Sequence, residues 1–165
     1  MNVFGVIGWK NSGKTGLVER LVCELNRRGF SVSTLKHAHH SFDLDRPGKD
    51  SYRHRVAGAS QVMVSSEERS ALISEFRGSS APSLSTLLTK LEPVDIVLVE
   101  GWKCDSHPNI ETWRSINDYA VLAETDPTIL AVASDLHLEL NCPNLDLNDT
   151  NAITDFILEN LEVLK

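Results

Sequence analysis

The fold is decided by the stretch VFGVIGWKNSGKT, residues 3–15. It starts as an apolar run and then breaks into a loop that has a glycine at each side. Four positions fit the pattern G-x-x-x-x-G-K-[ST] of a phosphate-binding loop, namely Gly8, Gly13, Lys14 and Thr15. The two glycines let the backbone N–H groups approach phosphate oxygens, which a Cβ atom would obstruct. The stretch therefore predicts a strand, a phosphate-binding loop and a helix, in this order.

The residues of this loop have distinct expected roles. Lys14, a candidate catalytic residue, is expected to reach the β and γ phosphates of a nucleotide, and the Thr15 hydroxyl is expected to bind Mg²⁺. The helix that begins here points the positive end of its dipole at the anion. Besides the two glycines, the expected nucleotide contacts are Lys10, Asn11, Ser12 and Gly16.

The sequence after the loop predicts an α/β fold. Apolar residues recur at helical spacing from Leu17 to Leu25, and Gly29 is placed to end this helix. Residues 31–36 follow as a second strand, so the unit is strand, helix, strand, which implies parallel strands. We expect a three-layer P-loop NTPase-type fold with a mostly parallel sheet flanked by helices.

Length and composition narrow the class of protein. The chain of 165 residues is long enough for one domain with its own core and too short for two of ordinary size, so residues 1–165 are expected to form a single domain. The formal charge of −7 argues against a general nucleic-acid or anionic-membrane binder. No stretch is long enough for a membrane span and no secretion signal is evident, so a cytoplasmic protein is expected.

The rest of the sequence predicts alternating strands and helices. The polar, histidine-rich segment 37–49 is expected to be a functional loop near the carboxyl ends of the strands. Helices are expected over residues 50–59 and 83–92 and from about residue 149, and strands over residues 61–65, 70–76, 94–101, 109–114 and 128–133.

The strand at residues 94–101 contains two candidates for the carboxylate that a phosphate-binding loop needs near its metal ion. Asp95 and Glu100 lie at its two ends, about 16 Å apart at 3.3 Å per residue. Only Glu100 is at the carboxyl end, where a parallel neighbour also presents the phosphate loop. Glu100 is therefore the expected metal-side acid, directly or through a water.

Together these motifs resemble one known family. The resemblance is carried by GWKNSGKT (8–15), KHAHH (36–40), FDLDRPGKDS (42–51), Arg53-His54, Ala57-Gly58-Ala59 and VEGWK (99–103). The chain is similar, as far as about Arg114, to the molybdopterin-guanine dinucleotide biosynthesis protein B family, MobB. The resemblance implies a P-loop GTPase-like protein, usually a homodimer, that binds GTP with Mg²⁺. It also implies a partner, the nucleotidyltransferase MobA, which attaches GMP to molybdopterin.

Two positions depart from the family and its fold group. Gly16 stands where the run commonly continues with a second Thr, so nucleotide binding is expected to be weakened but retained. Trp9 stands where the broader fold group often has a Lys that crosses a dimer, so no such Lys is assumed here.

Several other polar residues are open to more than one interpretation. Asp45 and Asp50 are the best acids of the 37–50 segment for sensing Mg²⁺ and the γ phosphate. Asp45 is a candidate catalytic base. Asp50 is a candidate metal ligand or, alternatively, a helix cap. Asp135 follows the strand at 128–133, where a guanine-reading Asp is expected, although the usual Asn-Lys partners are missing. Glu111 and Arg114 lie on opposite faces of the alternating segment 109–114, so they cannot share one small ligand without a bulge, and a cross-strand or dimer-edge role is expected for them.

The histidines are the basis of the main alternative function. His37, His39 and His40, with Asp43, Asp45 and His54, offer the imidazole and carboxylate ligands that suit Zn²⁺ or Ni²⁺, or they are polar residues that pair with acids or phosphate. The function expected first is a GTP-binding adaptor of molybdenum cofactor biosynthesis with slow or no hydrolysis, at most a weak GTPase. The alternatives are a GTP-dependent metallochaperone that uses residues 37–40 and a small-molecule P-loop kinase.

Overall fold

The computed structural model describes residues 1–38, 42–103, 105–117 and 119–161. The chain divides into two compact units, Met1–His37 with Leu91–Lys165 as unit 1 and Ala38–Lys90 as unit 2. Unit 2 is thus an insertion in the sequence of unit 1. The single domain expected from length stays a prediction.

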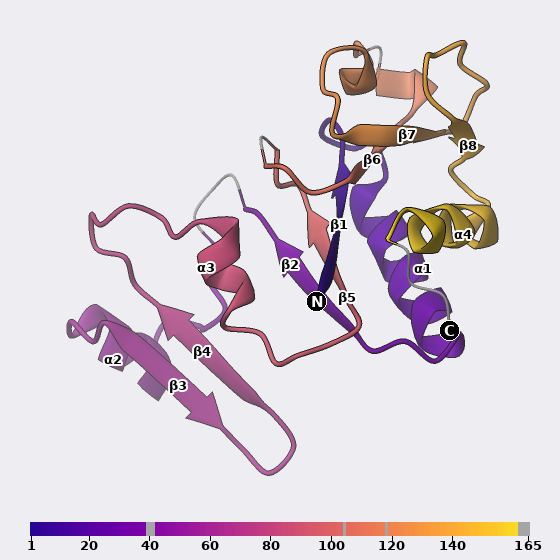
Figure 1. Cartoon of the computed structure of the whole chain (residues 1–165). Coiled ribbons are helices and arrows are strands. Elements are labelled where there is room, and N and C mark those ends of the chain that lie inside the picture. The colour runs from indigo at the N-terminus through magenta and orange to yellow at the C-terminus, as the bar shows by residue number, and fades with distance from the viewer. Residues whose placement is uncertain (39–41, 104, 118, 162–165) are drawn as a thin grey trace. The chain divides into compact units, whose positions relative to one another are not determined.

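The core of unit 1 is a six-stranded parallel sheet (Figure 1). Its strands are β1 (Asn2–Ile7), β2 (Val32–Lys36), β5 (Ile96–Glu100), β6 (Asn109–Trp113), β7 (Ile129–Ser134) and β8 (Asn144–Asp146), in the order β2-β5-β1-β6-β7-β8. Because β1 lies inside the sheet, the loop that follows it emerges between the ends of β5 and β6. The expected α/β class with a mostly parallel sheet is confirmed.

One face of this sheet is covered by two helices, α1 (Lys14–Arg27) and α4 (Thr150–Asn160). Figure 1 shows them side by side, and both contribute to one apolar core. The residues of α1 in this core have the predicted helical spacing, and they are Leu17, Val18, Leu21 and Leu25. Asp149 caps α4, since its carboxylate accepts from the Ala152 N–H at 3.0 Å.

The opposite face of the sheet carries the segment after β6. Ile110 packs in the helix-side core, so by strand alternation the neighbouring Glu111 points to the other face. There the Glu111 carboxylate accepts from the N–H groups of Leu122 and Ala123, at 3.0 and 2.9 Å, which begin the short helix η2 (Leu122–Glu124). A second 3₁₀ turn, η1 (Ser115–Asn117), precedes it.

Glu111 does not have the cross-strand or dimer-edge role that was expected for it. Strand β6 lies between β1 and β7, and Glu111 is fully buried. Burial raises the pKa of Glu111, and the two backbone N–H donors lower it. Glu111 is thus a buried carboxylate that is satisfied by the start of a helical turn, a contact that strand alternation does not predict.

Unit 2 contains the helices α2 (Asp50–Val56) and α3 (Leu84–Leu88) and an antiparallel pair, β3 (Gln61–Ser65) with β4 (Ser70–Ser74). Both helices are shorter than the sequence predicted. α2 ends before Gly58, whose φ of 115° is in the left-handed region, and α3 starts after Ser83, whose side chain accepts from the Thr86 N–H. None of the helices in the described part of the chain has the length and apolar character needed to span a bilayer.

Candidate phosphate-binding site

Three residues of the loop between β1 and α1 have a positive φ. Gly8 and Gly13 have φ values of 146° and 101°. Asn11 also has a positive φ, 63°, a conformation that Asn tolerates better than most residues. A Cβ atom at Gly8 would lie 2.7 Å from the Ser12 hydroxyl oxygen and would collide with the Thr112 carbonyl. The glycines are therefore required by the tight return of the chain, as the sequence predicted.

The loop is fixed to β6 by a buried hydroxyl pair. The Ser12 and Thr112 hydroxyl oxygens are 2.6 Å apart, and both residues are almost completely buried. Ser12, expected as a nucleotide contact, thus supports the loop from inside. Thr112 was not identified as a site residue because its partner is 100 residues away in the sequence.

The Lys14 ammonium is folded back onto the loop. It donates to the carbonyl oxygens of Gly8 and Trp9, at 3.0 and 2.6 Å. Burial lowers the pKa of Lys14, the Glu100 carboxylate raises it, and the ammonium groups of Lys103 and Lys36 lower it. Lys14 therefore shares a small region with two further cations and one anion, which suits a polyanionic ligand.

Glu100, the expected metal-side acid, meets Thr15 at the end of the sheet. The Thr15 hydroxyl donates to Glu100 Oε1 at 2.9 Å. Register explains the meeting, because Glu100 pairs with Val6 on β1, two residues before the loop. Asp95 lies at the other end of β5, where its carboxylate accepts from the Ser31 N–H and hydroxyl, both at 2.8 Å. The choice of Glu100 over Asp95 agrees with this arrangement.

Lys36 joins this pair. Its ammonium is 3.0 Å from Glu100 Oε1 and 3.4 Å from the Thr15 hydroxyl oxygen. Lys36 belongs to the motif KHAHH (36–40), but no role was predicted for it. Its position as the last residue of a strand before a polar loop is the signal that could have identified it.

Trp9 connects the loop to the segment that follows β6. Its indole N–H donates to the Ala120 carbonyl at 2.9 Å, and its ring centroid is 5.1 Å from that of Tyr119. The Lys103 ammonium lies 4.5 Å from the centre of the Trp9 ring, a cation–π contact. Lys10, the next loop residue, is exposed.

Arg114 is beside the start of α1, which the sequence analysis did not foresee. A Cβ atom at Gly13 would lie 3.1 Å from Arg114 Nε and 3.5 Å from Nη2. The buried Nε has no hydrogen-bond partner among the described residues. A guanidinium with an unused donor next to a phosphate-binding loop is suited to a ligand oxygen.

Asp135 lies directly after β7, at the same edge of the sheet as the loop. Its two carboxylate oxygens accept from the Ser115 N–H at 2.9 Å and from the Ser115 hydroxyl at 3.2 Å. A carboxylate has about four lone-pair sites, so these two bonds leave acceptor capacity.

Asp45 and Asp50 belong to unit 2. The Asp45 side chain is only 6% exposed, and its carboxylate forms an ion pair with Arg55 at 2.7 Å. Arg55 also contacts Asp43 and Glu75, at 2.9 and 3.1 Å. Asp50 is the first residue of α2, and Lys49 takes the cap position without a side-chain hydrogen bond. Asp50 is therefore not the side-chain cap that its alternative interpretation required.

The structure describes only part of the histidine segment. The His37 ring lies 4.8 Å from the Trp102 ring in an edge-on contact within unit 1. His39 and His40 lie outside the described residues, so the metal site that would include them stays a hypothesis. Within the described ranges, no group of three or more metal-ligating side chains is found.

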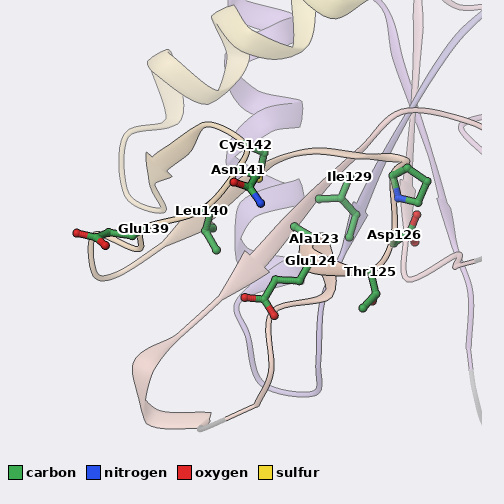
Figure 2. Close-up of a pocket in the computed structure, with 10 residues that line it drawn as sticks. Ala123, Glu124, Thr125, Asp126, Ile129, Glu139, Leu140, Asn141 and Cys142 are labelled. Carbon is green, nitrogen blue, oxygen red and sulfur yellow. The ribbon is translucent and has the colours of Figure 1, made fainter.

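A separate cavity of about 500 Å³ lies elsewhere in unit 1 (Figure 2). It is lined by residues of η2, the start of β7 and the segment 139–142. Three of its lining residues are acidic, Glu124, Asp126 and Glu139, and Asp126 already accepts from the Thr128 N–H and hydroxyl. Acidic walls repel phosphate, so this cavity is not a second candidate for the nucleotide.

The residues at the loop fit a nucleotide and its magnesium ion. The glycine turns leave a cradle that a Cβ atom would fill at Gly8, and Lys14 and Arg114 provide positive charge. Thr15 and Glu100 provide a hydroxyl and a carboxylate oxygen, and oxygen ligands are what Mg²⁺ prefers.

Comparison with known proteins gives a consistent result. Residues 3–135 match the family model "MobB: Molybdopterin guanine dinucleotide synthesis protein B". A "Molybdopterin-guanine dinucleotide biosynthesis adapter protein" of Escherichia coli is 37% identical over 154 residues, which are 92% of this chain and 88% of that protein. The protein of the same name from Haemophilus influenzae is 40% identical over 157 residues, 94% of this chain and 86% of that one.

Solved structures agree on the fold. A MobB homologue from Bacillus stearothermophilus superposes with a TM-score of 0.73 at 29% identity, and the match covers 99% of this chain and 100% of that one. MobB of Bacillus subtilis gives a TM-score of 0.77 at 23% identity, over 99% of this chain and 100% of that one. The family model, the relatives and the phosphate-binding loop agree: this chain belongs to the MobB family.

Proposed function

We propose that this chain is a cytoplasmic, GTP-binding adaptor that supports the attachment of GMP to molybdopterin. The observation that carries the proposal is the loop at residues 8–15, where a glycine cradle, Lys14 and the Thr15–Glu100 pair converge at the end of β1. The relatives' description as adapter proteins of molybdopterin-guanine dinucleotide biosynthesis supports the adaptor role. A MobA-like nucleotidyltransferase and molybdopterin are the proposed partners, and a homodimer is the proposed assembly.

In this proposal the chain binds the nucleotide mainly by charge and backbone donors. The loop N–H groups and Lys14 neutralise the phosphates, and Arg114 contributes its unused donor. Thr15 and Glu100 would hold Mg²⁺, which would further offset the phosphate charge. Hydrolysis of the bound nucleotide is proposed to be slow or absent.

Guanine recognition is assigned to Asp135. β7 lies two strands from β1, about 10 Å at the usual strand spacing, a separation that a nucleotide spans between its phosphates and its base. The remaining acceptor capacity of the Asp135 carboxylate matches the N–H and amine donors of guanine, which adenine does not present in the same pattern.

Calorimetric titration with GTP and with ATP, each with Mg²⁺, tests the proposal. We expect GTP to bind at least about tenfold more tightly than ATP, a difference of about 1.4 kcal/mol. Lys14→Ala should lose the binding, whereas Arg27→Ala, which removes a positive charge at the exposed end of α1, should keep it. Equal affinity for the two nucleotides would show that Asp135 does not select guanine.

The adaptor role is tested separately with the partner. The purified nucleotidyltransferase should form a complex with this chain in size-exclusion chromatography with light scattering, and the complex should form GMP–molybdopterin faster than the transferase alone. A chain that binds GTP but neither associates with the transferase nor changes its rate would contradict the adaptor role.

A further inference from the structure

The Lys36 ammonium occupies the place between two expected magnesium ligands. It lies 3.0 Å from Glu100 Oε1 and 3.4 Å from the Thr15 hydroxyl oxygen, and these two oxygens are themselves 2.9 Å apart. The three atoms form a closed triangle of a cation, a carboxylate and a hydroxyl. A lysine thus supplies the positive charge that the carboxylate would otherwise receive from a metal.

This arrangement follows from the strand register. Lys36 is the last residue of β2 and pairs directly with Glu100, the last residue of the neighbouring strand β5. The Lys36 side chain is 60% exposed, whereas that of Glu100 is 10% exposed. A long, exposed stem with its charged end on a buried carboxylate can move away without disturbing the core.

The loop lysine does not perform this task. Lys14 uses its donors on the Gly8 and Trp9 carbonyl oxygens. Across the described part of the chain, Lys36 is the cation that forms an ion pair with Glu100. A buried carboxylate without a partner is costly, so this pairing stabilises Glu100 when no metal is bound.

We propose that Lys36 is an internal counterion that competes with the divalent cation for Glu100 and Thr15. With no cation present, Lys36 holds both ligands in position and adds its positive charge to the phosphate site. When a divalent cation enters, Lys36 leaves Glu100. The proposal rests on the proposed nucleotide function for its phosphate half, and on the Lys36–Glu100–Thr15 geometry alone for its metal half.

Three variants separate this role from a general charge effect. Lys36→Met removes the charge and keeps the length of the side chain. Arg27→Met removes one positive charge from the last turn of α1, at a side chain that is 70% exposed and about 20 Å along the helix from the loop. Lys36→Arg restores the charge and serves as the rescue variant.

The first measurement is GTP affinity by calorimetry, in EDTA and in saturating Mg²⁺. For Lys36→Met we expect about tenfold weaker binding in EDTA, since one charge-assisted contact is lost, and little change in Mg²⁺. Lys36→Arg should recover most of the affinity in EDTA, and Arg27→Met should match the wild type. An equal loss in both conditions would show an ordinary phosphate contact or a structural defect and would overturn the proposal.

The second measurement uses Mn²⁺ on the nucleotide-free protein. Paramagnetic broadening of the Thr15 and Gly101 amide signals should begin at about a tenfold lower Mn²⁺ concentration in Lys36→Met than in the wild type or Arg27→Met, because no ammonium must be displaced. No gain in Mn²⁺ sensitivity overturns the proposal. If the wild type binds no GTP in either condition, the nucleotide function fails, and this measurement still decides the role of Lys36.

Discussion

The hydroxyl oxygens of Ser12 and Thr112 lie 2.6 Å apart in the interior, and they join the phosphate loop to the strand beside it. Thr112 also donates to the Ile7 carbonyl at 3.3 Å, so this one side chain contacts both the end of β1 and the loop that follows. The conformation of the loop is therefore held in place before a ligand arrives, which reduces the ordering that binding would otherwise require.

Replacement of Thr112 tests this tether. Thr112→Val has nearly the same shape but leaves the buried Ser12 hydroxyl without its partner, so we expect a loss of about 1–2 kcal/mol in the free energy of unfolding. Thr112→Ser keeps the hydroxyl and should lose less. Urea unfolding of the two variants measures the difference, and GTP affinity should fall with Thr112→Val only. Equal stability of Thr112→Val and the wild type would contradict a supporting role for the pair.

Gly8 should be far less tolerant of a side chain than Gly29. Gly8→Ala brings a Cβ atom against the Thr112 carbonyl and within 2.7 Å of the Ser12 oxygen, so we expect a loss of about 3 kcal/mol or more and no GTP binding. Gly29 also has a positive φ, 85°, but a Cβ atom there meets nothing within 4 Å. Gly29→Ala should therefore cost only about 1 kcal/mol and keep GTP affinity. Similar unfolding midpoints for the two variants would show that the collision at Gly8 is relieved.

Substitution of Gly16 is expected to increase stability and GTP affinity rather than to reduce them. It lies in the first turn of α1, where a Cβ atom would meet only Arg20 Nη1 at 3.8 Å. Gly16→Ala should raise the free energy of unfolding by about 0.5–1 kcal/mol because the helix gains propensity. Gly16→Thr adds a hydroxyl at the phosphate site, and we expect tighter GTP binding than in Gly16→Ala. Calorimetry on both variants separates the hydroxyl from the helix effect, and identical affinities would exclude a phosphate contact at this position.

The burial of His107 predicts that the stability of the fold depends on pH. The residue is 8% exposed, and neither ring nitrogen has a hydrogen-bond partner within the described ranges. Burial lowers the pKa of His107, while Asp105, Asn109 and Asp126 raise it by less. The unfolded chain therefore binds the proton more readily than the folded one. Stability is then fully present above a pH of about 6.5 and is lost as the pH falls below it.

Thermal unfolding between pH 8 and pH 5 measures this dependence. The carboxylates of the protein also titrate toward the acid end, so the comparison is made with His107→Gln, in which the imidazole is absent. The difference in Tm between wild type and variant should shrink as the pH falls through about 6.5. A difference that stays constant over this range would mean that His107 is not held neutral in the fold.

Much of unit 1 followed from local sequence patterns. The strand, loop and helix at residues 3–27 were predicted because each depends on neighbours: an apolar run, glycines at tight turns and helical spacing. The parallel arrangement followed from the same unit, and Glu100 was preferred to Asp95 because it lies at the carboxyl end of its strand, on the side of the phosphate loop. The three-residue strand β8 was missed because Asn144–Asp146 is too short and too polar for a periodic pattern.

Pairing between distant segments decided the rest. The sequence by itself determined that a phosphate loop follows a buried strand and that a carboxylate ends another, since backbone conformation and strand length are local properties. Only the tertiary structure decided that β6 lies beside β1, which buries Glu111 and brings Thr112 and Arg114 to the loop. It likewise placed Lys36 on Glu100 through the register of β2 with β5. Strand order and register depend on the packing of residues far apart in the chain, and no local pattern specifies them.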